Sequence, residues 1–406
     1  MKNNKISDLE FIGIMASLMA LAAMSIDALL PGLNEIGKAI GVIDPKDNQF
    51  IITIVVLGLG FGQLVSGALS DSIGRKPVMY IGCIVFAIAS IICVMATHFE
   101  IMIAGRFLQG VGLSAPRSVS TAIIRDKYSG NQMARIMSYI VVVFILAPVI
   151  APTFGKVLLD NFGWESIFYS QLIFGIVVTI WLWQRQPETL KKEDQKKMNL
   201  ALFSNGLRAF FKIPKAIVYT IISGLISAPF LAYMSASQQI FSQQYNLEDV
   251  YPYIFSGLAL GIGLATFLNG KLVMKYGMQK MAMIPMFVLL SISSIYIVLF
   301  SGESNPDSIV FIGFLALILF SIGFIFGNLN AMAMQPIGHI AGIGASIIGC
   351  VSTLVSVPVA AIIGQFINKT SLPLFIGFTV CTILSILMMA VVNRNSESST
   401  IPLKAE

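Results

Sequence analysis

The chain has 406 residues, of which 56% are hydrophobic and 11% charged, with a mean hydropathy of +0.84 and a formal net charge of +6. Soluble globular domains carry roughly 25% charged residues, so this composition excludes a soluble protein. Apolar stretches of about 20 residues, enough for a helix to cross a bilayer, recur along the chain without the alternation typical of barrel strands. The sequence therefore predicts an all-α membrane protein with twelve transmembrane helices. We expect them at residues 9–38, 49–70, 78–97, 101–124, 132–158, 165–184, 215–243, 251–272, 280–300, 308–334, 343–367 and 372–393.

The basic residues indicate how these helices are oriented. If both termini are cytoplasmic, 20 of the 26 lysines and arginines fall on cytoplasmic segments, as the positive-inside rule expects. The positive charge is then explained by topology, and we expect no nucleic-acid partner. The first apolar stretch has no small-residue cleavage site, so we expect it to be retained as a helix.

Asp27 is the only acidic residue well inside a predicted span. A carboxylate at that depth costs on the order of 3 kcal/mol unless it faces the bundle interior or an aqueous cavity. A structural carboxylate paired with a buried arginine and a proton carrier both fit this position, and we favour the carrier. Pro31 lacks an N–H, so we expect the helix to kink near Asp27. Asn34, one turn further outward, is a candidate cavity residue.

Residues 62–77 place a very short charged turn between the second and third spans. The turn is too short to be a domain, yet it carries both signs of charge and two glycines seven residues apart. We interpret it as a latch at a membrane face. Its candidate gate residues are Gly67, Asp71, Gly74, Arg75 and Lys76.

The fourth predicted helix carries a polar stripe. Arg106 and Arg117 are eleven positions apart, which returns to nearly the same helical face about 16 Å along the axis. Gln109 shares this face, so we expect the stripe to face a water-accessible centre. Arg106 lies at the depth of Asp27 and is its natural partner, whereas Arg117 lies nearer the cytoplasmic mouth.

The fifth predicted helix contains Pro148, Pro152 and Gly155. Each proline removes a backbone hydrogen bond, which a membrane tolerates only where neighbours or water satisfy the freed carbonyls. We expect this helix to bend and to pack closely against another helix.

The second half of the chain repeats the first. Gly270 and Gly277 lie 203 positions after Gly67 and Gly74, at the same helix-to-loop junction. An even number of spans per half predicts two parallel six-helix halves related by an axis along the membrane normal. The expected parts are a six-helix bundle over 1–184, a cytoplasmic connector over 185–214, a second bundle over 215–393 and a cytoplasmic tail over 394–406.

The seventh predicted helix offers aromatic, soft and neutral polar side chains. Such a wall suits an amphipathic organic ligand, although ordinary helix packing also explains each residue singly. The candidate cavity residues are Phe230, Tyr233, Met234 and Gln238.

Metal and enzyme sites are not indicated. The four cysteines lie in apolar stretches without CxxC spacing, and the two histidines stand apart, so we expect no metal and no cofactor. The sequence has no HExxH motif, no paired intramembrane carboxylates and no nucleophile elbow. We therefore expect no enzyme, and the two-half repeat disfavours a passive channel.

These motifs resemble those of the major facilitator superfamily. Residues 67–76 resemble its signature between helices 2 and 3, and residues 106–110 resemble the helix 4 motif of its proton-coupled drug antiporters. The double Ala-Pro pattern over 147–155 and the helix 1 segment from Asp27 to Pro31 resemble the bicyclomycin/chloramphenicol-resistance branch. The resemblance covers essentially the whole chain.

The resemblance implies alternating access by two rocking halves around a central cavity, in a bacterial inner membrane. Asp27 is then the proton site with Arg106 as partner, and Asp71 latches the inner face through Arg125 and the start of helix 11. We expect a monomer that exchanges protons for small amphipathic organic molecules, as a multidrug efflux antiporter. A dedicated transporter of one metabolite, such as a siderophore, is the alternative, and Arg106 with Arg117 would suit an anionic one.

Overall fold

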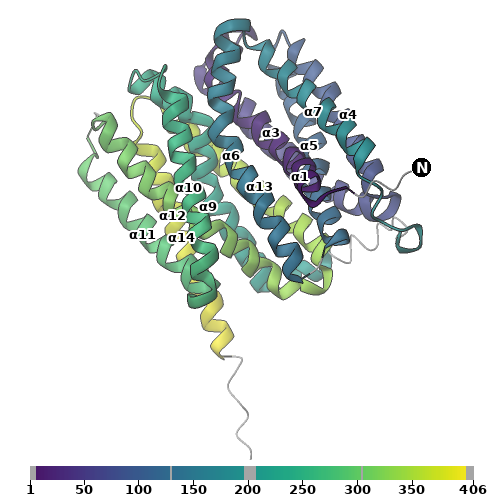
Figure 1. Ribbon diagram of the computed structural model, residues 1–406. Coiled ribbons are helices and arrows are strands. Elements are labelled where there is room, and N and C mark those ends of the chain that lie inside the picture. The colour runs from purple at the N-terminus through teal and green to yellow at the C-terminus, as the bar shows by residue number, and fades with distance from the viewer. Residues whose placement is uncertain (1–5, 129, 196–206, 303–304, 399–406) are drawn as a thin grey trace, which may run out of the picture. The chain divides into compact units, whose positions relative to one another are not determined.

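The computed structural model describes residues 6–128, 130–195, 207–302 and 305–398 (Figure 1). These residues are almost entirely helical and contain no β-strand. Twelve helices have 20 residues or more, which agrees with the predicted number of spans. They are α1 (Asp8–Asp27), α3 (Asn48–Ile73), α4 (Arg75–Val94), α5 (Phe99–Lys127), α6 (Gly130–Phe162), α7 (Glu165–Arg185), α9 (Pro214–Gln239), α10 (Tyr251–Tyr276), α11 (Met278–Leu299), α12 (Ser308–Met334), α13 (Ala341–Phe366) and α14 (Leu372–Ser398).

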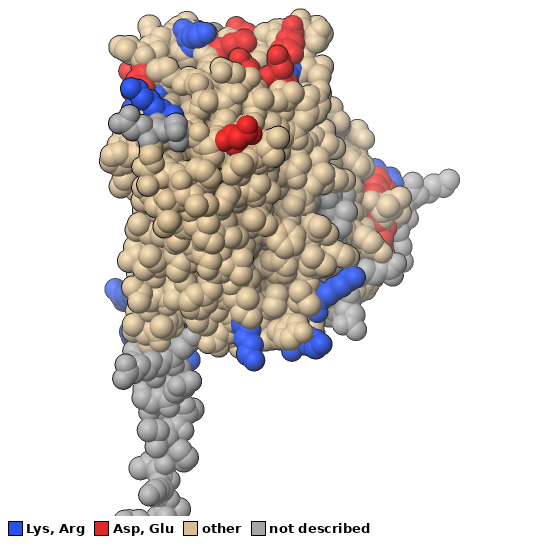
Figure 2. All heavy atoms as spheres, turned by 90° about the vertical axis from the view of Figure 1, so that its left-hand side faces the viewer, with Lys and Arg blue, Asp and Glu red and all other residues tan. Residues whose placement is uncertain are grey.

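The surface fits a bilayer environment. Ten helical stretches of the described chain are long and apolar enough to cross a membrane. The helices α5 and α6, of 29 and 33 residues, complete the twelve, and α5 is less apolar because it carries the predicted polar stripe. Figure 2 shows charged side chains gathered toward the two ends of one face, with a broad uncharged band between them. The lower end shows lysines and arginines without acidic residues, and the upper end shows acidic residues together with some basic ones.

The first span is broken where the sequence predicted a kink. The helix α1 ends at Asp27, a short 3-10 turn covers Leu30–Gly32, and α2 (Leu33–Ala39) continues outward along the chain. Pro31 occupies the first turn of the second segment, where its missing N–H leaves the α1 ladder without a continuation. The break therefore places Asp27 at the carboxyl end of a helix.

The chain forms two compact units. One contains Met1–Phe203 together with Met234–Leu260, and the other contains Ser204–Tyr233 together with Gly261–Glu406. The helices α9 and α10 therefore each contribute to both units. The predicted division into bundles over 1–184 and 215–393 stays a prediction, and its connector and tail include residues 196–206 and 399–406, which lie outside the described part.

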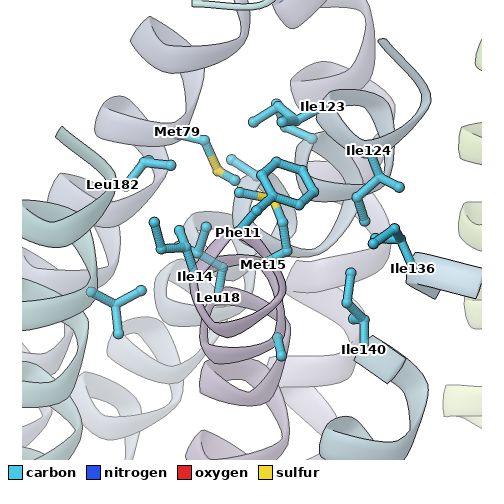
Figure 3. Packing of buried hydrophobic residues seen from close by; sticks show 14 of the residues in the cluster. Phe11, Ile14, Met15, Leu18, Met79, Ile123, Ile124, Ile136, Ile140 and Leu182 are labelled. Atoms are coloured by element: carbon cyan, nitrogen blue, oxygen red, sulfur yellow. The ribbon is translucent and has the colours of Figure 1, made fainter. Parts of the chain in front are cut away.

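A hydrophobic core holds the start of α1 against four other helices of the first unit (Figure 3). Its side chains are branched or flexible apolar groups from α1, α4, α5, α6 and α7, and they include Phe11, Ile14, Met15, Leu18, Met79, Ile123, Ile124, Ile136, Ile140 and Leu182. At the edge of this core, Tyr128 packs on the Phe11 ring and donates a hydrogen bond of 2.6 Å to Asp8. Burial, with a further contribution from Asp8, raises the pKa of the Tyr128 hydroxyl above its usual value.

Small residues let α5 lie very close to its neighbours. A Cβ on Gly58 of α3 would collide with the carbonyl oxygen of Phe107, and one on Gly110 of α5 would collide with that of Val55. On the other side of α5, a Cβ on Gly82 of α4 would lie 2.5 Å from the Cβ of Ala115. Close backbone approach of this kind is a common way to pack helices in membranes. The helix that carries the polar stripe is thereby fixed between α3 and α4.

The internal repeat is visible in the backbone of each unit. Gly74 separates α3 from α4 with φ of 108°, and Gly277 separates α10 from α11 with φ of 80°. Both conformations favour glycine, which explains why the sequence repeats this residue at this junction. A polar bridge is repeated as well, because Ser66 contacts Ser118 at 2.9 Å and Asn328 donates to Asn269 at 2.8 Å.

Candidate transport site

Asp27 is a buried carboxylate at the end of α1. Its side chain is 2% exposed, and its Oδ1 atom has no hydrogen-bond partner in the described structure. An unpartnered buried acceptor is costly, so such a group commonly has a functional reason. The break in the first span puts this carboxylate where the backbone is no longer a regular helix.

Arg106 lies beside this break, fully buried, but it does not pair with the Asp27 carboxylate. Its Nε donates to the carbonyl of Ile51 at 3.0 Å, and its NH2 donates to the carbonyl of Ser25 at 3.1 Å. Its NH1 donates to Gln109 at 2.6 Å, and its guanidinium lies 5.9 Å from the centre of the Phe168 ring. Among the described residues no ion pair joins Arg106 to Asp27, so the expected pair is not formed. Backbone carbonyls take the place of the carboxylate, and Arg106 ties α1, α3 and α5 together.

Gln109 serves this arginine and not an open cavity. It is fully buried, accepts from Arg106 and donates through Nε2 to the Ser90 hydroxyl at 2.7 Å. Ser90 in turn donates to the carbonyl of Phe86 at 2.8 Å. The predicted cavity role of Gln109 is therefore corrected to a positioning role, because both ends of its amide are used inside the protein.

The helix α6 approaches the break closely. Gly155 lies against the backbone of Ala28, and a Cβ at this position would collide with the Ala28 carbonyl oxygen. Pro148 and Pro152 lie within the same helix, which continues through both. The expected close packing is confirmed, and its partner is the residue that follows Asp27.

A second cluster lies at the junction of α3 and α4. Arg75, 3% exposed, forms ion pairs with Asp71 at 2.5 Å and with Asp126 of α5 at 2.9 Å. It also donates to the Ser70 hydroxyl at 2.8 Å. The family resemblance implied that Arg125 would make the α5 contact, but its side chain is exposed and forms no ion pair within 4 Å among the described residues. The contact is made instead by Asp126, the residue after Arg125. An acid is needed there because the buried residue at the junction, Arg75, is itself a cation.

Glu188 completes this cluster, and sequence reasoning missed it. Its carboxylate accepts from the backbone N–H groups of Arg75 at 3.1 Å and Lys76 at 2.9 Å, at the first turn of α4. A carboxylate is favoured at a helix N-terminus, where backbone N–H groups are unpaired. The Lys76 ammonium donates to the carbonyl of Trp183 at 3.2 Å.

A Cβ on Gly74 would lie 2.9 Å from the Glu188 carboxylate, so position 74 requires glycine for space as well as for its positive φ. The Pro187-Glu188-Thr189 sequence was the available signal.

Segment Met234–Leu260 makes polar contacts with the other helices of its unit. The amide of Gln49 donates to that of Gln239 at 3.1 Å, and Ser256 hydrogen-bonds the carbonyl of Val149. The Nζ atom of Lys156 lies 3.0 Å from the Oδ1 atom of Asp160 and 3.8 Å from the Oδ1 atom of Asp249. None of these residues was among the predicted site residues.

The remaining predicted site residues are spread over the two units. Arg117 is exposed, Gly67 and Asn34 are half-buried, and Met234 is half-buried on α9. Tyr233 and Gln238 are each 2% exposed. Phe230 packs edge-on against Phe326 at 5.7 Å. A common cavity lined by these residues stays a prediction. The described residues contain no group of His, Cys, Asp and Glu able to hold a metal.

Comparison with known proteins places this architecture in a family. The model of the Major Facilitator Superfamily matches residues 14–359. A bicyclomycin resistance protein homolog of Haemophilus influenzae is 28% identical over 392 residues, which cover 95% of this chain and 96% of the relative. The multidrug resistance protein MdtL of Salmonella paratyphi A is 25% identical, with the same coverage. The crystal structure of a D-xylose–proton symporter shares the fold with a TM-score of 0.71 at 13% identity, covering 94% of this chain and 96% of the symporter.

The family match spans most of the chain, and the helices, the glycine junctions and the polar contacts of α5 agree with it. Such proteins are multi-pass membrane transporters of small organic solutes. This chain therefore belongs to the Major Facilitator Superfamily and is a secondary transporter.

Proposed function

We propose that this protein is a proton-coupled antiporter that exports small amphipathic organic molecules. Its relatives include proteins named for bicyclomycin and multidrug resistance, which supports efflux as the direction of transport. The observation that carries the proposal is Asp27, a buried carboxylate with an unpartnered oxygen beside a helix break.

The Asp27 carboxylate is the proton carrier in this proposal. When Asp27 is ionised, its charge lies two residues from the carbonyl to which Arg106 donates, so the cation stabilises it without a direct ion pair. Protonation removes that charge and converts an acceptor into a donor for nearby backbone carbonyls freed by the break. Gly155 contacts the same break, so a local change at Asp27 acts directly on α6.

Transport follows from an exchange of two sets of contacts. We assign the Arg75 cluster, with Asp71, Asp126 and Glu188, to the cytoplasmic face, because the positive-inside rule places its turn there. We assign the contacts of segment Met234–Leu260 to the outer face. An outer proton neutralises Asp27 and solute leaves outward; the proton then leaves inward after the conformational change.

The same distribution of charge supports both termini in the cytoplasm and location in a bacterial inner membrane. The lower end of the face in Figure 2 carries basic side chains alone, whereas the upper end carries acidic side chains together with some basic ones. We propose a monomer as the working unit, because the expected cycle needs only the two repeated halves of one chain.

A dedicated transporter of one metabolite, such as a siderophore, is the second candidate. Arg117 favours it, because an exposed guanidinium in a membrane helix suits an anionic solute. Accumulation of chemically diverse dyes in cells with and without the protein separates the two candidates, since a dedicated transporter exports one chemical type.

The proposal is tested with purified protein in liposomes under an imposed pH gradient. Asp27→Asn should abolish gradient-driven dye transport while leaving insertion and thermal unfolding near the unmodified values. Glu100→Gln, which changes an exposed acid at the start of α5, is the matched control and should transport normally. Full gradient coupling in the Asp27→Asn protein would refute the assignment.

A further inference from the structure

Arg117 is a charged side chain within α5 that the protein leaves open. It is exposed, and the described residues provide neither an ion pair nor a hydrogen-bond acceptor for it. Arg106, eleven positions earlier, is fully buried, and all three of its nitrogens donate to protein acceptors. The two arginines of α5 are therefore in opposite states: Arg106 is buried and each of its nitrogens is hydrogen-bonded, whereas Arg117 is exposed and has no described partner.

Arg117 lies on the face of α5 that is turned toward the other helices of the protein and away from lipid. At 3.6 residues per turn, Arg117 lies within about 20° of Arg106 around the axis. Arg106 points to α1 and α3, as its bonds to Ser25 and Ile51 show. The exposed apolar residues Ile101 and Leu108 lie roughly on the opposite side of α5, where a lipid-facing surface is expected. Arg117 therefore does not face the hydrocarbon.

The protein's own acids are used elsewhere. Asp71 and Asp126 pair with Arg75, and Glu188 caps the first turn of α4. The hydroxyl of Ser118, next to Arg117 in sequence, contacts Ser66 and donates to the carbonyl of Ser114. A guanidinium stays charged under all physiological conditions and is expensive to hold in a membrane segment without a partner. No described protein group therefore serves as its counter-ion, which leaves the guanidinium available to an anion that enters from solution.

We propose that Arg117 is the charge-recognition residue for the transported solute, and that the solute is an amphipathic organic anion bearing a carboxylate. The guanidinium fork matches a carboxylate with two parallel hydrogen bonds, which supplies orientation as well as charge. Arg106 contributes to the local potential but not to direct binding, because its side chain is fully buried and each of its nitrogens already donates to a protein acceptor. This inference rests on the proposed function only in requiring that the protein transports an organic solute.

The test compares two dyes with one scaffold: fluorescein, which carries a carboxylate, and rhodamine 6G, which is a cation. Binding is measured by titration of the full-length protein in lipid nanodiscs, and transport is measured in liposomes. Arg117→Gln should weaken fluorescein binding about ten-fold or more, the loss expected for hydrogen bonds between charged groups. Arg117→Lys should recover part of that loss, because it keeps the charge but not the fork.

The control is Arg208→Gln, which removes an exposed arginine from the short helical segment 207–211. It should leave fluorescein binding and the KM for fluorescein unchanged. Rhodamine 6G should bind the Arg117→Gln protein as well as, or better than, the unmodified protein.

Three results would overturn the inference: no binding of fluorescein by the unmodified protein, equal loss of both dyes in Arg117→Gln, or the same loss in Arg208→Gln. Failure of the proposed function has a different signature. Fluorescein would then bind in an Arg117-dependent manner, but a pH gradient would drive no transport of either dye.

Discussion

Gly155→Ala tests whether α6 and the helix break beside Asp27 work as one unit. An alanine Cβ would collide with the carbonyl oxygen of Ala28 and lie 2.8 Å from its carbonyl carbon and 3.1 Å from its Cα. Ordinary contacts between carbon atoms are about 3.5–4.0 Å, so α1 and α6 must separate by roughly 1 Å. The obstacle is backbone and cannot rotate away. Overpacking of this kind typically costs about 1–3 kcal/mol.

The assay has two parts, thermal unfolding in detergent and gradient-driven transport in liposomes. We expect Gly155→Ala to lower the Tm and to reduce transport more than solute binding, because the contact adjoins the proposed proton carrier. Gly313→Ala is the matched control, since this helical glycine of α12 has nothing within 4 Å of an added Cβ. It should keep or raise the Tm, because alanine is the better helix former. Unmodified stability and transport in Gly155→Ala would refute the reasoning.

Three further predictions address the other contacts. Arg106→Lys should lower both the Tm and the transport rate, because a single ammonium cannot replace the three hydrogen bonds that the guanidinium makes to Ser25, Ile51 and Gln109. An unchanged Tm and transport rate would show that these bonds are dispensable. Glu188→Gln should slow turnover, measured by transport, with little change in solute binding, measured by titration. The reason is that it weakens the cap on the first turn of α4. A loss of binding without a change in turnover would count against a latch. Cysteines at positions 49 and 239, joined by a short bifunctional thiosulfonate reagent that spans the length of the two replaced glutamines, should stop transport until the link is reduced. Continued transport by the cross-linked protein would contradict the proposed exchange of contacts.

Sequence reasoning succeeded where a residue type leaves few physical choices. The apolar stretches had to be membrane helices, and a proline four residues after Asp27 had to interrupt the ladder. The repeated glycine spacing predicted equivalent junctions, and both glycines adopt the positive φ that favours them. Gly155 was expected to pack closely, and it does.

Partners across the fold were harder to predict. Depth along the membrane placed Arg106 near Asp27, but it could not show that backbone carbonyls of Ser25 and Ile51 lie closer to the guanidinium than the carboxylate does. Likewise, adjacent residues on α5 point about 100° apart, and only the structure shows that Asp126 and not Arg125 meets Arg75. Carbonyls carry no sequence signal, so side-chain patterns overlook them as partners.

The central claim is that Asp27 carries the proton that is exchanged for solute. The most direct measurement is solute-induced proton movement in liposomes that contain the purified protein and a trapped pH indicator. The account predicts that adding solute moves protons with the unmodified protein, and that Asp27→Asn binds solute but moves none. Proton movement by Asp27→Asn equal to that of the unmodified protein would contradict the account.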